Sequence, residues 1–271
     1  MPDRHTPALF PQNHTLRSGR VPWAILALLL SCFFCSLAQA GPETEKSNTT
    51  AQYTQEGLQT LFGATARKLT ENEAARTGEW HNWQRVIGEG RTGPPDEVFA
   101  GMPGPRLVQW KAVCTQYAKA SPIEQLRLVS GFFNNWASKP DSSVYGVEEY
   151  WATAQEFLQN AGGDCEDYAI VKYEALRFLG WDINNLWIVL VSDNTRVTNH
   201  AVLVARSGKA TYVLDNLSSP GNLVMQEDKY RLLYTPIAAL SHDNMWVFSK
   251  ENEPAGPTES FFRMRTGPGA F

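Results

Sequence analysis

The chain has 271 residues, a formal net charge of −4 and only 19% charged residues. This weakly acidic balance argues against a nucleic-acid partner, which would need clustered positive charge. The roughly 230 residues beyond the first 40 are enough for one substantial domain with its own hydrophobic core.

The first 40 residues have the pattern of an export signal. Arg4, Arg17 and Arg20 precede an apolar run from Val21 to Leu37, and the small residues of Ala38-Gln39-Ala40 suit a signal-peptidase site. We therefore predict an exported protein whose mature chain begins near residue 41. The alternative is an uncleaved membrane anchor, because the apolar run is as long as the shortest membrane spans, about 17 residues.

Residues 41–105 are expected to be a leader followed by an irregular segment. Residues 41–56 (GPETEKSNTTAQYTQE) are polar and lack periodicity, and the chain from Gly88 to Pro105 is dense in glycine and proline, which favours a surface loop. Between them, Leu58 to Leu69 is a candidate helix. The main domain is placed at residues 106–250, and residues 251–271, rich in proline and glycine, are predicted to be a flexible tail.

Two helices with capping boxes are predicted within this domain. In SPIEQLRLVSGFFNNWA, Ser121 and Glu124 form the box, Pro122 suits the first turn, and apolar residues follow at helical spacing. In WATAQEFLQNAGG, Thr153 and Glu156 form the second box.

The period of the hydrophobic pattern changes after residue 180. LWIVLVSD (186–193), NHAVLVAR (199–206) and TYVLDNL (211–217) are rich in β-branched and aromatic residues, with turn signals between them, and MWVFS (245–249) is a further candidate strand. Helices followed by a meander of strands predict an α+β fold with an antiparallel sheet.

The stretch GGDCEDYAIVKYEALRFLG predicts a helix that begins at Cys165 and closes on Gly180. A helix N-terminus lowers the pKa of a thiol, whereas the flanking carboxylates of Asp164, Glu166 and Asp167 oppose the thiolate. At about 100° per residue, the three acids lie on one side of the helix and Cys165 on the other. A hard cation would relieve their mutual repulsion, so we predict that they bind Ca²⁺. The alternative is that the acids only complement the helix dipole.

His200 and Asp215 lie on neighbouring predicted strands. A two-residue turn at Ser207-Gly208 would place them directly opposite each other, and a four-residue loop would make them diagonal neighbours, so they share a face in either register. With Cys165 as nucleophile they complete a Cys-His-Asp triad. The alternative is a purely structural cross-strand pair, with Cys165 in a disulfide to Cys114.

The DCEDYAI helix start, with EYWATAQEFL before it and NHAVLV and VLDNL after it, resembles the LapG-type bacterial transglutaminase-like cysteine proteinases. The resemblance covers roughly residues 107–248. It implies a papain- and transglutaminase-like core, in which a helix bearing the nucleophile packs on an antiparallel sheet bearing histidine and aspartate. It also implies the roles of the site residues: nucleophile Cys165, general base and acid His200, orienting group Asp215, and calcium ligands Asp164, Glu166 and Asp167.

The same resemblance implies a periplasmic, calcium-dependent endopeptidase. The implied substrate is a large cell-surface adhesin, cut near its N-terminus at a dialanine-type site, which releases the adhesin and disperses biofilm. The implied inhibitor is an inner-membrane cyclic-di-GMP receptor of the LapD type. Two other functions remain open on the same residues. One is a transglutaminase-like acyltransferase, in which an amine replaces water at the thioester, and the other is a non-enzymatic calcium-binding or sequestration module.

Overall fold

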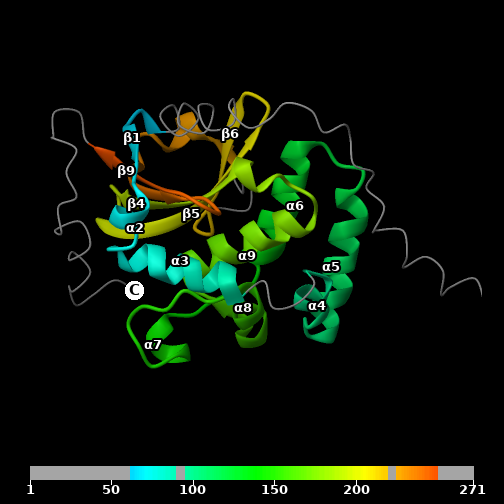
Figure 1. Ribbon diagram of the computed structural model, residues 1–271. Helices are drawn as coiled ribbons and strands as arrows, with labels where there is room; N and C mark the ends of the chain where they lie inside the picture. The colour runs from blue at the N-terminus through cyan, green and yellow to red at the C-terminus, as the bar shows by residue number, and fades with distance from the viewer. Residues whose placement is uncertain (1–61, 90–94, 219–223, 250–271) are drawn as a thin grey trace, which may run out of the picture. The chain divides into compact units, whose positions relative to one another are not determined.

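The computed structural model describes residues 62–89, 95–218 and 224–249, all within one unit of the chain, residues 47–271. An antiparallel sheet forms one layer of this unit (Figure 1). In order across the sheet, its strands are β1 (Thr65–Lys68), β9 (Met245–Ser249), β8 (Tyr234–Leu240), β4 (Leu186–Asp193), β5 (Thr198–Ser207), β6 (Ala210–Leu214) and β7 (Met225–Gln226).

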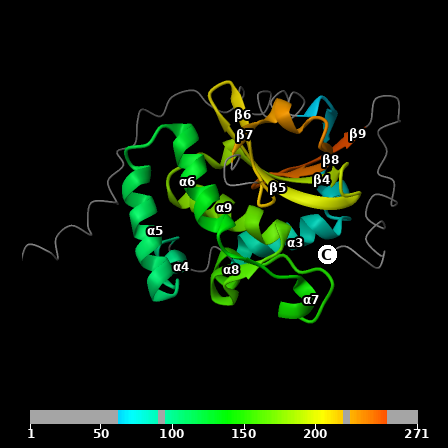
Figure 2. The same ribbon diagram turned by 180° about the vertical axis from the view of Figure 1, so that it is seen from behind.

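Helices α3, α8 and α9 lie on one side of this sheet, as Figures 1 and 2 show from opposite directions. The α-helices are α2 (Glu71–Ala74), α3 (Gly78–Glu89), α4 (Pro95–Ala100), α5 (Gly104–Tyr117), α6 (Pro122–Asn134), α7 (Asp141–Val144), α8 (Ala154–Asn160) and α9 (Cys165–Phe178). Two 3-10 turns, η2 (Ile183–Asn185) and η4 (Glu227–Tyr230), and a short parallel pair, β2 (Ala137–Ser138) with β3 (Gly162–Gly163), complete the described elements. Within the described ranges, no helix has both the length and the apolar character needed to cross a membrane.

Both predicted capping boxes are present. The carboxylate of Glu124 accepts the Ser121 N–H at 2.9 Å at the start of α6, and that of Glu156 accepts the Thr153 N–H at 2.7 Å at the start of α8. The predicted helix at Cys165 is α9, and it is followed by Gly180 with a φ of +95°, a conformation that favours glycine. Local sequence signals therefore place these three helices correctly.

The predicted irregular segment is wrong where the structure describes it. Thr65–Lys68 is strand β1, paired with β9, and not the end of a helix. Helix α3 (Gly78–Glu89) precedes the expected loop and ends inside it, and α4 (Pro95–Ala100) lies within it. Trp83 of α3 is fully buried, donates its indole N–H to the Ser241 carbonyl at 2.6 Å and packs edge-on against Tyr173 of α9. These short elements depend on tertiary packing, which local propensity does not report. The folded domain thus begins well before residue 106.

The predicted export signal and leader within residues 1–61 and the tail at 251–271 lie outside the described residues. The four predicted strands correspond to β4, β5, β6 and β9. Alternate residues of β4 face two different hydrophobic clusters. Ile188 packs with the helices, whereas Trp187 and Val189 pack with Val202 and Val204 of β5 on the opposite face. Both faces of the central strands are therefore buried.

Candidate active site

The hairpin between β5 and β6 sets the positions of His200 and Asp215. Ser207 pairs with Ala210, so the two-residue turn is Gly208-Lys209, one residue later than the shorter of the two predicted turns. Gly208 has a φ of +60°, which is typical of the first central residue of a type II′ turn. In this register Asp215 follows β6 as a diagonal neighbour of His200, as the second predicted register requires.

His200 and Asp215 form a buried hydrogen-bonded pair. The Nε2 atom of His200 lies 2.9 Å from Oδ1 of Asp215, and each residue is only 3% exposed. With Nε2–H donating to the carboxylate, Nδ1 is the ring nitrogen left to act as a base. Two of the three predicted catalytic residues are therefore in direct contact.

The carboxylate of Asp215 accepts two further hydrogen bonds. Its Oδ1 also accepts the Leu217 N–H at 2.8 Å, and its Oδ2 accepts the Tyr234 hydroxyl at 2.6 Å. The carbonyl of Asp215 accepts the Asn134 side-chain amide at 2.8 Å, which ties this residue to the end of α6. Burial alone would raise the pKa of Asp215, but the hydrogen bonds and the charge of His200 hold that pKa below its usual range. Asp215 is thus kept ionised beside the imidazole.

Cys165 is the first residue of α9, the helix that packs against β5 and β4. Cys165 and Cys114 are both thiols, so the predicted alternative of a disulfide between them is wrong. The sulfur of Cys165 lies 2.9 Å from Oε2 of Glu166. Glu166 therefore does not turn away from the thiol as the helical angles predicted, because a glutamate side chain is long enough to reach back to its neighbour.

Two glycines directly before α9 each allow a close approach, Gly162 to the backbone of β2 and Gly163 to a side chain of α9. A Cβ atom on Gly162 would lie 2.0 Å from the carbonyl oxygen of Ala137, and one on Gly163 would lie 2.2 Å from Oδ2 of Asp167. The carboxylate of Asp167 instead accepts the Ala152 N–H at 2.6 Å and the Asp164 N–H at 3.3 Å. Asp167 thus holds together the backbone around the start of α9.

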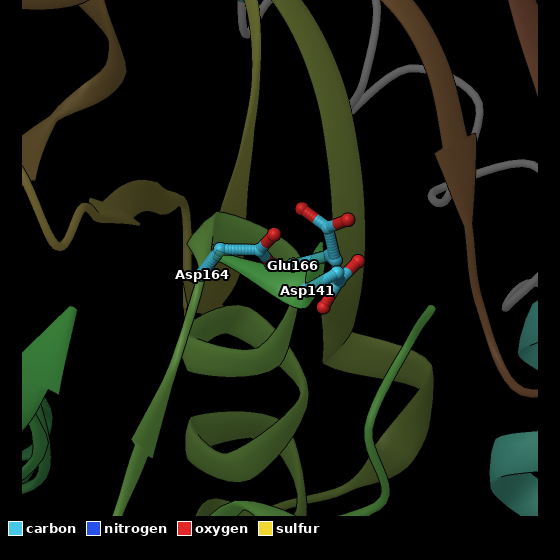
Figure 3. Close-up of side chains that lie close together, drawn as sticks. All are labelled: Asp141, Asp164 and Glu166. Carbon is cyan, nitrogen blue, oxygen red and sulfur yellow. The ribbon is translucent and has the colours of Figure 1, made fainter. Parts of the chain in front are cut away.

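Three carboxylates converge at this helix start. Single oxygen atoms of Asp141, Asp164 and Glu166 all lie within 4.8 Å of one another. Figure 3 shows Asp164 and Glu166 at the first turn of α9 and Asp141 approaching from a separate segment. Asp141 and Glu166 are each 2% exposed. Asp141 was not predicted as part of the site, and Asp167, which was, lies outside this group of ligand atoms.

The acidic cluster of Asp141, Asp164 and Glu166 has the donor set of a hard cation. Burial, followed by the negative charges of Glu166, Asp167 and Asp141, raises the pKa of Asp164 far above its usual range. Buried carboxylates in contact need either protons or a cation to neutralise them. Carboxylate oxygens drawn from two separate segments of the chain, α7 and the start of α9, are the ligand type that Ca²⁺ takes. The residues present therefore fit the predicted metal.

Residues 109–253 match the family model of the bacterial transglutaminase-like cysteine proteinases. The chain belongs to this family. Together with the mixed helices and antiparallel sheet, the match confirms the predicted α+β, transglutaminase-like fold and makes the chain a cysteine peptidase. No curated protein matches the chain.

Solved structures similar to this family member include two forms of LapG from Legionella pneumophila. The calcium-bound form is 24% identical, with a TM-score of 0.47 over 61% of this chain and 87% of that chain. The EGTA-treated form is 23% identical, with a TM-score of 0.46 over 63% of this chain and 88% of that chain.

Sequence reasoning missed several residues around the proteinase site. Asn134 ends a helix and Tyr234 begins a strand, so both look like ordinary core positions, and Asp141 follows a proline at a helix start, where an aspartate is common. Of the missed residues, Lys172 was the one whose sequence position could have indicated a place near the site. It lies two helical turns beyond Cys165, amid apolar residues, and the structure buries it completely.

Proposed function

We propose that this chain is an exported, calcium-dependent cysteine endopeptidase of the periplasm. It cuts a large cell-surface adhesin near the adhesin's N-terminus, at a dialanine-type site, and the release of the adhesin disperses biofilm. The observation that carries the proposal is the buried hydrogen bond between His200 and Asp215, next to a helix that begins at a thiol, in a member of this proteinase family. The export pattern of the first 40 residues supports the location.

In the proposed mechanism, Nδ1 of His200 takes the proton of the Cys165 thiol, and the thiolate attacks the peptide carbonyl. The tetrahedral intermediate collapses to a thioester, and the leaving amine takes the proton from the imidazolium. His200 then deprotonates a water molecule, which hydrolyses the thioester and restores the thiol. The backbone N–H of Cys165, in the first turn of α9, is a donor without an intrahelical acceptor and can stabilise the oxyanion.

We assign the calcium to Asp141, Asp164 and Glu166. When bound, the ion supplies positive charge that offsets the acids' unfavourable field on the thiolate. Glu166 is the link between the two sites, because its Oε2 atom lies 2.9 Å from the sulfur of Cys165. The predicted ligand Asp167 acts in this proposal through the backbone, since it accepts the Ala152 and Asp164 N–H groups. The inhibitor, by resemblance of the motifs, is an inner-membrane cyclic-di-GMP receptor of the LapD type.

The proposal is tested by incubating the mature protein with the N-terminal region of a co-encoded giant adhesin and following cleavage on a gel. We expect cleavage with calcium and none in EGTA, and both Cys165→Ala and His200→Ala should abolish it, whereas Cys114→Ala should not. Cleavage that survives either of the first two changes would remove the triad. A primary amine added to the same reaction distinguishes hydrolysis from acyl transfer, because an acyltransferase would couple the amine to the substrate.

A further inference from the structure

Tyr234, the first residue of β8, touches both members of the buried catalytic pair. Its hydroxyl donates to Oδ2 of Asp215 at 2.6 Å, and its ring centroid lies 5.7 Å from that of His200. The residue is 4% exposed, so water does not compete for this hydrogen bond.

The two oxygens of the Asp215 carboxylate have different partners. Oδ1 accepts both the imidazole Nε2–H of His200 and the Leu217 N–H, whereas the Tyr234 hydroxyl approaches Oδ2. A carboxylate rotates easily about its terminal torsion. A donor on Oδ2 opposes that rotation and keeps Oδ1 directed at His200.

We propose that Tyr234 is a positioning residue of this active site, whose hydroxyl fixes the Asp215 carboxylate and, through it, the orientation of the His200 ring. The inference rests on the proposed function, because it assigns a role within the same Cys-His-Asp triad. Tyr234 acts through Asp215 and touches neither the nucleophile nor the peptide in this proposal.

The surroundings keep the Tyr234 hydroxyl in its donating form. Burial, followed by the negative charge of Asp215, raises the pKa of Tyr234 far above its usual range. Lys172 on α9 also lies in the field of Asp215, and Tyr230 of η4 stacks on Tyr234 with ring centroids 5.2 Å apart. His200 faces the same carboxylate, and the guanidinium of Arg196 also lies in the field of Asp215. The negative charge of Asp193 acts on Tyr234 in the same direction as that of Asp215.

Tyr230 provides a matched control. It is 1% exposed and lies against Tyr234, but its hydroxyl pairs with Oγ of Ser218 at 3.1 Å. Tyr234→Phe and Tyr230→Phe each remove one buried hydroxyl from the same aromatic stack, and only the first removes a donor to the triad. If the activity falls only because the aromatic stack is disturbed, it should therefore fall in both variants.

The experiment measures peptidase kinetics and the alkylation of Cys165 by iodoacetamide across pH. It uses the mature chain from residue 41, which lacks Cys32 and Cys35, in a Cys114→Ala background, so that one thiol is followed. Tyr234→Phe should lower kcat about tenfold, the equivalent of one hydrogen bond to a charged group, with little change in KM. The loss of a donor to the ionised carboxylate raises the pKa of Asp215. As the pH is lowered, the alkylation rate of Cys165 should therefore begin to fall at a higher pH in Tyr234→Phe than in the parent protein. Tyr230→Phe should resemble the parent in both measurements.

The outcomes separate this inference from the proposed function. If His200→Ala leaves the alkylation of the parent unchanged, the triad itself fails. If that alkylation depends on His200 but Tyr234→Phe behaves as Tyr230→Phe does, only the role of Tyr234 fails. In an Asp215→Asn background, Tyr234→Phe should have little added effect on kcat. A further tenfold fall in kcat in that background would also overturn the proposal.

A measurement without a tyrosine variant covers the case in which Tyr234→Phe does not fold. The hydrogen bond from Tyr234 to Asp215 should give a slowly exchanging hydroxyl proton, far downfield in the NMR spectrum of the unsubstituted protein. Asp215→Asn should move this signal upfield, because an amide oxygen is a weaker acceptor than a carboxylate. A spectrum that Asp215→Asn leaves unchanged would contradict the contact on which the inference depends.

Discussion

Lys172 shows how strongly the environment of a single residue alters its chemistry. The side chain is completely buried in α9, and its Nζ has no hydrogen-bond acceptor among the described residues and lies 5.8 Å from the ring centroid of Tyr168. Burial lowers the pKa of Lys172 to about 7, although the charge of Asp215 opposes this shift. Near neutral pH, the folded protein therefore holds a largely desolvated amine within the field of Asp215.

This shift predicts a pH dependence of stability. Between the folded pKa of about 7 and the ordinary value of 10.5, the unfolded chain binds more protons at Lys172, so the free energy of unfolding rises with pH across this window. Lys172→Met should remove this rise and increase the free energy of unfolding at neutral pH by about 1–4 kcal/mol. Urea denaturation at several pH values measures both effects. The exposed Lys111→Met serves as control, and an unaltered pH dependence in Lys172→Met would contradict the prediction.

At the scale of elements, β8 lies inside the sheet, between β9 and β4, although it contains a proline. Pro236 pairs with Val191, and the register shifts between Leu190 and Val191, so Ile237 is an extra residue in a β-bulge. Proline cannot donate a ladder hydrogen bond, and a bulge is where a sheet tolerates it. In this register Tyr234 pairs with Asp193 of β4, and its hydroxyl reaches Asp215. A proline within the run argues against a central strand when the sequence alone is considered, and this strand was not among those predicted.

The β2–β3 pair makes a second prediction at this scale. Gly162→Ala should lower the free energy of unfolding by about 1–3 kcal/mol, because the new Cβ would meet the Ala137 carbonyl at 2.0 Å and the residue has a φ of +145°. Gly88→Ala, in α3, is the matched control, since nothing lies within 4 Å of its Cβ position and alanine is the better helix former. Thermal unfolding of Gly162→Ala and Gly88→Ala measures the difference in stability. Equal stabilities would show that the loop before Cys165 adapts without cost.

At the scale of the whole molecule, the acidic cluster connects α7 to the start of α9. Asp141 also accepts the Tyr150 N–H at 2.5 Å, so the segment that approaches α8 is tied to the same carboxylate. A cation held by Asp141, Asp164 and Glu166 would cross-link parts of the chain that the unfolded protein leaves separate. The free energy of cation binding would then add to the free energy of unfolding.

Calcium is accordingly expected to raise Tm. At about 100 times Kd, a single site stabilises the folded state by about 2.7 kcal/mol, which corresponds to a rise in Tm of a few degrees for a domain of this size. Asp141→Asn should abolish most of the rise, whereas Asp228→Asn, at an exposed position, should retain it. Differential scanning calorimetry with calcium and with EGTA measures the shift. A full calcium shift in Asp141→Asn would exclude this residue from the site.

Short-range signals in the sequence were sufficient for much of the fold. Capping residues, glycine after α9 and the alternation of β4, β5, β6 and β9 all act within a few residues, so the corresponding elements could be predicted. The hairpin geometry that brings His200 to Asp215 is equally local, since 15 residues separate them. The family motif around Cys165 agreed with these signals and with the family match.

Contacts between distant segments were decided only by the tertiary structure. Asp141 joins Asp164 and Glu166, Asn134 reaches the Asp215 carbonyl, and Tyr234 reaches its carboxylate, each across a stretch of chain with no spacing rule. The side chain of Glu166 also reached back to the sulfur of Cys165, against the helical angles, and Asp167 accepts backbone N–H groups and lies outside the group of possible ligand atoms. The sequence by itself determined which residues could perform the chemistry. Packing determined which of them meet, because hydrogen-bond partners and desolvation depend on the whole fold.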